Sequence, residues 1–141
     1  MAESQGISIK GLVLGLLADI GATFAGSLAI GFLFGLLHAS RGGSTPEDIE
    51  RALNGSSSFL LALCFMGLLC SLLGGWVAGW IAGHSEVKHG VILGVIGLAL
   101  GGLSLRAAPA QPMWSLALTF GLTIPACALG GHVRAEQRLR A

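Results

Sequence analysis

The feature that most limits the fold of this chain is an apolar stretch from Gly11 to Leu37, which contains a single charged residue, Asp19. At about 1.5 Å per residue, a helix over residues 10–38 reaches roughly 42 Å, more than the ~30 Å hydrocarbon core of a bilayer. The stretch is also too long for the core of a cleaved signal peptide. We therefore predict an uncleaved first transmembrane helix that tilts or protrudes into water.

Three more apolar stretches follow the first. Only 11% of the residues are charged, against about 25% in ordinary soluble domains, so polar side chains are too few to cover a globular surface. In lipid each span must satisfy its own backbone hydrogen bonds, which selects helices. The sequence thus predicts one all-α integral membrane domain over residues 1–141, a bundle of four transmembrane helices at about residues 10–38, 58–83, 87–105 and 113–132.

The connections between the predicted spans differ in character. Residues 39–57 form a long polar loop, in which Thr45 is suited to an N-cap and Pro46 to the first helical position. This pattern predicts a short surface helix from Pro46 to Leu53. The segment GHSEVKHG permits only a tight turn, RAAPAQP with its two prolines predicts an irregular link, and residues 133–141 form a basic tail.

Basic residues are distributed unevenly over the two sides of the predicted bundle. One side carries Lys10, Lys88, Arg134, Arg138 and Arg140; the other carries Arg41, Arg51 and Arg106. The positive-inside bias then predicts that both termini are cytoplasmic. A net charge of +1 without a basic cluster argues against a nucleic-acid partner.

Two short patterns occur twice in the chain. KGLVLGLL at 10–17 resembles HGVILGVI at 89–96, and LGGWVAG at 73–79 resembles LGGHVRA at 129–135. The first pattern opens spans one and three, and the second closes spans two and four. This echo predicts two helical hairpins in the same orientation, related by an axis along the membrane normal. Chance similarity in a chain rich in glycine and leucine is the alternative.

Small residues recur at helical spacing in three of the predicted spans. Rows of this kind let helix backbones approach closely within a membrane. The predicted packing positions are Gly11, Gly15, Asp19 and Gly26 in the first span, Gly75, Gly79 and Gly83 in the second, and Gly90, Gly94, Gly97 and Gly101 in the third. Either all rows lie inside a tightly packed bundle, or one row remains outside for other membrane subunits or a second copy.

The stretch GGWVAGWIAGHSEVKHGVILGVIG resembles the signature of small uncharacterised bacterial four-helix membrane proteins, GG-x-x-A-G-x-x-A-G followed by H-G. The matching positions are Gly74, Gly75, Ala78, Gly79, Ala82, Gly83, His89 and Gly90. The basic residue often found within this glycine row is replaced here by Trp80. The resemblance implies the four-span fold and a bacterial cytoplasmic membrane, and it implies no activity.

Asp19 is the main chemical clue in the sequence. A charged carboxylate in the core of a bilayer costs about 2.5–3.5 kcal/mol on insertion scales, so Asp19 must face protein or water. Thr23, one turn later, is able to donate a hydrogen bond to it. The pair predicts a proton- or cation-binding site; the alternative is a neutral or hydrogen-bonded acid that fixes helix packing, or that pairs with another subunit.

The other polar groups offer weaker hypotheses. His84, His89 and His132 all fall near the predicted inner face, where they are candidates for a metal or haem site or for solvated and capping side chains. We predict no cofactor. Thr119 and Thr123 precede Pro125, which predicts a kink in which a threonine hydroxyl compensates the freed carbonyl. Cys64, Cys70 and Cys127 lie in apolar runs and are expected to be small buried residues.

The chain lacks the motifs of metalloproteases, serine hydrolases and phosphate-binding loops, so we predict that it is not an enzyme. The leading interpretation is a structural or accessory subunit that packs on a larger membrane complex or on itself through a glycine-lined face. The alternative is a small transporter or channel in which oligomers line an ion or proton path past Asp19. A redox subunit that binds haem or quinone is the third interpretation.

Overall fold

A computed structural model describes residues 6–40, 45–105 and 112–140. Within these ranges the chain forms the helices α1 (Ile9–Ala39), α2 (Pro46–Gly55), α3 (Ser57–Ala82), α4 (Glu86–Ser104) and α5 (Met113–Arg140). All but α2 are long and apolar enough, by length and composition, to cross a membrane. The predicted all-α bundle with four spans is confirmed.

Side-chain caps explain where three of the helices begin. The Ser8 Oγ accepts a hydrogen bond from the Gly11 N–H at 3.2 Å and starts α1. Thr45 caps α2 in the same way, with Pro46 in the first turn, and this confirms the predicted surface helix, which ends at Gly55 rather than Leu53. The Ser56 Oγ accepts from the Phe59 N–H and starts α3 directly after α2. Each cap satisfies a backbone donor that the helix itself leaves free.

The turn between α3 and α4 is as tight as the sequence predicted, and it corrects the role of Gly83. We expected Gly83 to pack against a neighbouring helix, but a Cβ at this position meets no atom within 4 Å. Gly83 has φ 66° and is the C-cap of α3, a conformation that glycine adopts without strain. Ser85, at φ 46°, also lies in the left-handed region, which costs a residue with a Cβ about 1–2 kcal/mol.

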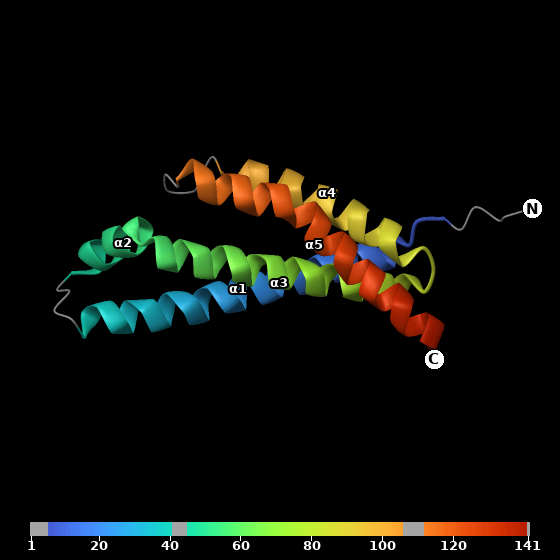
Figure 1. The fold of residues 1–141 in the computed structure, drawn as a ribbon, viewed down its shortest axis with the longest axis horizontal. Helices are drawn as coiled ribbons and strands as arrows, with labels where there is room; N and C mark the ends of the chain where they lie inside the picture. Colours follow the sequence, from blue (N-terminus) through green and yellow to red (C-terminus); the bar gives the residue numbers. More distant parts are fainter. Residues whose placement is uncertain (1–5, 41–44, 106–111, 141) are drawn as a thin grey trace, which may run out of the picture.

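Helix α5 differs from its prediction in two respects. It continues to Arg140, so the basic tail is helical through that residue and is not a separate segment. The Thr123 hydroxyl donates to the Thr119 carbonyl at 2.6 Å, whereas Pro125 leaves the carbonyl four residues before it, that of Gly121, without its helical donor. The predicted compensation at that carbonyl is therefore wrong, although the helix does change direction along its length (Figure 1). Most of the predicted RAAPAQP link lies outside the described residues.

The spans form two antiparallel hairpins, α1 with α3 and α4 with α5, in the same orientation (Figure 1). The hairpins lie close together at the end that carries both termini and diverge toward the end that carries α2. Helix α3 packs on α1, α4 and α5, while α1 and α5 make no contact within the described residues. Since an exact two-fold axis would make the α3–α4 and α1–α5 contacts equal, the hairpins are not arranged with that symmetry.

Glycines bring the helix backbones into direct contact at the end of the bundle that carries both termini, which we call its closed end. A Cβ on Gly75 would collide with the Cys127 carbonyl, and a Cβ on Gly130 with the Leu72 carbonyl, so α3 and α5 cross at the two LGG patterns. On α1, a Cβ at Gly15 would lie 2.7 Å from that of Ala78. The remaining predicted glycines with close neighbours in other helices are Gly11, Gly26, Gly79, Gly90 and Gly94. These predicted rows therefore lie inside the bundle.

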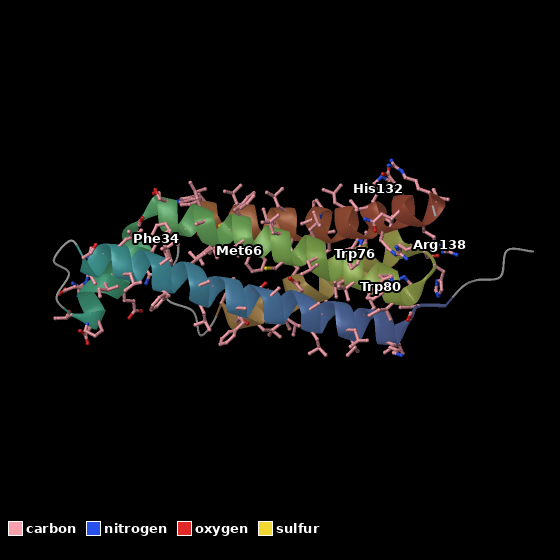
Figure 2. All side chains as sticks on the ribbon, turned by 90° about the horizontal axis from the view of Figure 1, so that it is seen from below. Phe34, Met66, Trp76, Trp80, His132 and Arg138 are labelled. Carbon is pink, nitrogen blue, oxygen red and sulfur yellow. The ribbon has the colours of Figure 1, made fainter. Side chains whose placement is uncertain are left out.

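The outer surface of the bundle suits a lipid environment. Large apolar side chains such as Phe24, Phe32 and Phe65 are exposed along the spans. Figure 2 shows Trp76, Trp80 and Arg138 near the end that carries the termini, with Phe34 at the opposite end. Aromatic and basic residues at the ends of spans are typical of helices anchored at membrane interfaces.

The backbone contact between α3 and α5 predicts a position-specific cost of adding one methyl group. Gly75→Ala and Gly130→Ala force the two backbones apart and should each lower the free energy of unfolding by about 1–3 kcal/mol. Gly67→Ala and Gly121→Ala are the matched controls on the same helices, since a Cβ there meets no atom within 4 Å. Circular dichroism during denaturation in detergent measures the difference. Equal stability of all four variants would contradict the packing.

Candidate functional site

A cavity of about 560 Å³ lies between the two hairpins and is lined by residues of α1, α3, α4 and α5. The cavity begins where the helix backbones are no longer in close contact. A Cβ added to Gly97 would meet no atom nearer than 3.9 Å, and a Cβ added to Gly101 would meet none nearer than 3.5 Å. We call this space the inter-hairpin cavity. Its walls are mainly apolar, and its polar side chains are Asp19, Thr23, Ser27, Ser71, Ser104, Thr119 and Thr123.

Asp19 lies at the end of the inter-hairpin cavity that is nearer the closed end of the bundle, where α1, α3 and α4 meet. Its side chain is only 8% exposed. The Ser71 hydroxyl donates a hydrogen bond to Asp19 Oδ1 at 3.3 Å. Glycines of α3 and α4 lie next to Asp19. A Cβ added to Gly97 would lie 4.0 Å from Asp19 Oδ2, and a Cβ added to Gly74 would lie 2.7 Å from the Cβ of Asp19. The carboxylate therefore spans the gap between three helices and has one oxygen directed toward α4.

The surroundings of Asp19 supply little compensation for a negative charge. None of the ion pairs among the described residues involves Asp19. Thr23, predicted as its partner in ion binding, lines the same cavity one turn later on α1. The structure thus brings the two predicted residues together and adds Ser71, which the sequence reading missed. The sequence offered one sign of this contact: Ser71 lies one helical turn before Gly75, so its hydroxyl falls on the same face as the small-residue row of the second span.

Two further polar contacts close the terminal end of the bundle. His89 is 2% exposed, and its Nε2 accepts a hydrogen bond from the Ser8 backbone N–H at 2.8 Å. Because a backbone N–H only donates, Nε2 carries the lone pair and Nδ1 carries the proton, which points to the Ser85 carbonyl at 3.1 Å. Both nitrogens of the imidazole therefore contact backbone groups, and these contacts join the start of α1 to that of α4.

The second contact joins the end of α5 to the turn between α3 and α4. Arg138 Nη1 donates to Glu86 Oε1 at 3.0 Å and also to the Gly83 carbonyl at the C-terminus of α3. The Glu86 side chain is 9% exposed, whereas that of Arg138 is 56% exposed. Trp76, stacked on Trp80, donates from Nε1 to Gln137 Oε1 at 2.9 Å. The helical tail thus covers the closed end of the bundle.

The predicted histidine cluster does not form a ligand set. His84 packs edge-on against His89, with ring centroids 5.3 Å apart. His132 is exposed on α5 and lies 3.4 Å from Glu136. Within residues 6–40, 45–105 and 112–140, no group of three or more His, Cys, Asp or Glu side chains is placed to hold a metal ion.

The cysteines are free thiols. Cys127 is fully buried with Ala78 and Leu93 in the centre of the bundle, Cys70 is buried, and Cys64 is partly buried. The Cys64 Sγ lies 3.3 Å from the Thr119 Oγ1 across the α3–α5 contact. The prediction of small buried residues is confirmed for Cys70 and Cys127, whereas Cys64 is only partly buried.

Comparison of this chain with protein-family models, curated proteins and solved structures gives no match. The interpretation of the site therefore depends on its geometry.

The bonded imidazole of His89 predicts that this residue matters for stability. His89→Ala removes a buried side chain and leaves the Ser8 N–H without its acceptor, and it should lower the free energy of unfolding by about 1–3 kcal/mol. The exposed His132 provides the control, and His132→Ala should change stability by less than about 0.5 kcal/mol. Hydrogen exchange of the Ser8 amide, followed by NMR, should also accelerate in His89→Ala alone. Unchanged exchange would show that the Ser8–His89 bond is absent.

The Arg138–Glu86 pair predicts an unequal effect of removing either partner. Arg138→Gln leaves the buried Glu86 carboxylate without its counter-ion and should destabilise the protein more than Glu86→Gln, which removes the charge itself. Arg140→Gln is the control, because Arg140 is exposed and lies 3.7 Å from Glu136. Thermal unfolding in detergent measures the order. A larger loss in Glu86→Gln than in Arg138→Gln would contradict it.

Proposed function

We propose that this protein is a small membrane transporter that binds a cation at Asp19 in exchange for a proton. The observation that carries the proposal is the placement of Asp19: a nine-tenths buried carboxylate at one end of the inter-hairpin cavity, with hydroxyl groups beside it and no ion pair among the described residues. Ionisable groups inside membrane spans commonly mark substrate or proton pathways.

The chemistry follows from the poor solvation of the carboxylate. A neutral, protonated Asp19 suits the apolar walls of the inter-hairpin cavity, whereas an ionised Asp19 requires a positive partner. A bound cation supplies that partner and releases the proton, so the two compete for one group. Ser71 holds the carboxylate in place through either state, because its hydroxyl is able to donate to Oδ1 in both.

The packing favours this function over an accessory subunit. The accessory interpretation requires one of the predicted glycine rows to face a partner, yet Gly11, Gly15, Gly75, Gly90 and Gly94 of these rows contact helices of the same chain. The transport interpretation had assumed that copies of the chain together line the path. The inter-hairpin cavity instead lies within one chain, so a single copy supplies the walls around Asp19.

The distribution of charge suggests an orientation for the transporter. Lys10, Lys88 and the arginines of α5 lie at the closed, terminal end of the bundle, which we propose is cytoplasmic. The divergent end then faces the other side of the membrane. Of the residues predicted for that side, Arg51 lies on α2, and Arg41 and Arg106 lie outside the described residues. In this arrangement transport requires the closed end to open.

A proteoliposome assay tests the role of Asp19. Purified protein is reconstituted with an internal pH dye, and inward gradients of sodium, potassium or tetraethylammonium chloride are imposed. We expect at least one of these cations to drive proton efflux in the wild-type protein and the efflux to fall at least tenfold in Asp19→Asn, which has no group to protonate. Glu50→Gln, at an exposed carboxylate on α2, is the matched control and should retain the flux.

The result is interpretable only if the variants fold alike. Equal circular dichroism spectra and equal elution in detergent establish this for Asp19→Asn and Glu50→Gln. Proton efflux that is unchanged in a folded Asp19→Asn protein contradicts the proposal, as does wild-type efflux no greater than that of empty liposomes.

A further inference from the structure

We infer that the inter-hairpin cavity takes a small organic cation with an apolar body, such as a quaternary or tertiary amine, in preference to a metal ion. The inference depends on the proposed function, since it names the class of cation that meets Asp19. It is carried by three features of the cavity: its donor set, its volume and the position of its opening.

The donor set is too sparse for a metal ion. Hard cations such as Ca²⁺ take six to eight oxygen ligands, and Mg²⁺ takes six. Asp19 is the one carboxylate among the residues that line the cavity, and no cluster of ligating side chains is present within the described residues. A metal ion at Asp19 would lose hydration that this site does not replace. An ammonium ion with alkyl groups has a diffuse charge and needs only the single counter-ion.

The hydroxyls that line the cavity are largely committed to other partners. Ser71 donates to Asp19, Thr123 donates to the Thr119 carbonyl, and Ser104 donates to the Leu100 carbonyl at 3.0 Å. Thr119 itself lies within hydrogen-bond distance of Cys64. A sugar or an amino acid, which needs many hydrogen bonds, is poorly served by such walls. A quaternary ammonium ion has no N–H or O–H group to satisfy.

The volume also favours an organic ligand. At about 560 Å³ the cavity falls in the range of about 300–1,000 Å³ that small-molecule sites occupy. A bare metal ion leaves most of this space unfilled. Leucines from each span and two phenylalanine rings, Phe24 of α1 and Phe120 of α5, line it. These apolar walls are suited to bury alkyl groups.

The opening of the cavity lies on the surface that faces lipid. Ile20 is 51% exposed and Phe24 is 67% exposed on α1. Leu100 of α4 and Leu105, the C-cap of that helix, are each 41% exposed, yet all four residues line the cavity. The space between the hairpins therefore opens among side chains that contact the bilayer. An amphiphilic cation partitions into this region and reaches Asp19 from within the membrane, with its apolar groups along the walls.

Binding to a homologous series tests the inference. Ethyl-, propyl- and butyltrimethylammonium are titrated calorimetrically into the protein in lipid nanodiscs, with sodium and potassium chloride as the alternative ligands. If the walls bury the alkyl chain, affinity should rise about fourfold per methylene, the equivalent of about 0.8 kcal/mol. Asp19→Asn should weaken butyltrimethylammonium at least tenfold, and each bound cation should release a proton.

A glycine pair on α4 gives a second variant that retains Asp19. Gly97→Leu extends a side chain into the cavity near the carboxylate, where a Cβ alone has room, and should weaken binding at least tenfold. Gly102→Leu is the matched control, because a Cβ there meets no atom within 4 Å, and it should bind as the wild type does. This pair keeps the test valid if Asp19→Asn fails to fold.

The outcomes separate the inference from the proposed function. Affinity that is independent of chain length, or binding unaffected by Gly97→Leu, overturns the inference. If sodium or potassium drives proton release through Asp19 and no ammonium ion binds, the inference fails and the proposed function stands. If butyltrimethylammonium binds at Asp19 and no tested cation drives proton efflux from proteoliposomes, the inference stands and the proposed function fails.

Discussion

Direct contact between helix backbones at one end of the bundle determines the rest of the structure. Gly75 and Gly130 let α3 and α5 touch, and Gly11 and Gly15 do the same for α1 and α3. In a bilayer no hydrophobic force drives helices together, so close van der Waals packing of this kind supplies much of the attraction. Because these contacts are concentrated at the terminal end, the hairpins meet there and diverge toward α2. The cavity is a consequence of that uneven packing.

The position of Asp19 follows from the same geometry. On α1 it lies one turn beyond Gly15, and there the close backbone contact gives way to the inter-hairpin cavity. Closer to the terminal end, the touching backbones would leave no space for a ligand beside the carboxylate. Farther toward the divergent end, the carboxylate would be more exposed to its surroundings. Its placement at the boundary combines burial with access.

Some of this arrangement is readable from the sequence, and some is not. Hydropathy and length predict the four spans because the bilayer imposes both, and the cap at Thr45 depends on residues next to it in the chain. Ser71 and the Arg138–Glu86 pair depend on how distant helices align, which local patterns do not specify. The spacing of Gly83 fitted a packing row, but its place at the helix end gave it a different role.

The contacts at the closed end set the energetic problem that the proposed transport must solve. Ser8 with His89 and Arg138 with Glu86 join three helices there through satisfied polar groups, and the glycine contacts add dispersion along the same surfaces. A ligand shifts a conformational equilibrium only by its differential affinity for the two states. A cation must therefore bind the open state more tightly than the closed one by enough to offset these contacts, and reversing a 1:99 population takes about 5.5 kcal/mol. In the proposed transport cycle, a single ion pair with Asp19 would provide part of this difference, and burial of the ligand's apolar groups against the walls of the cavity would provide a second source. The same apolar walls would then serve both the selection of the ligand and the opening of the closed end.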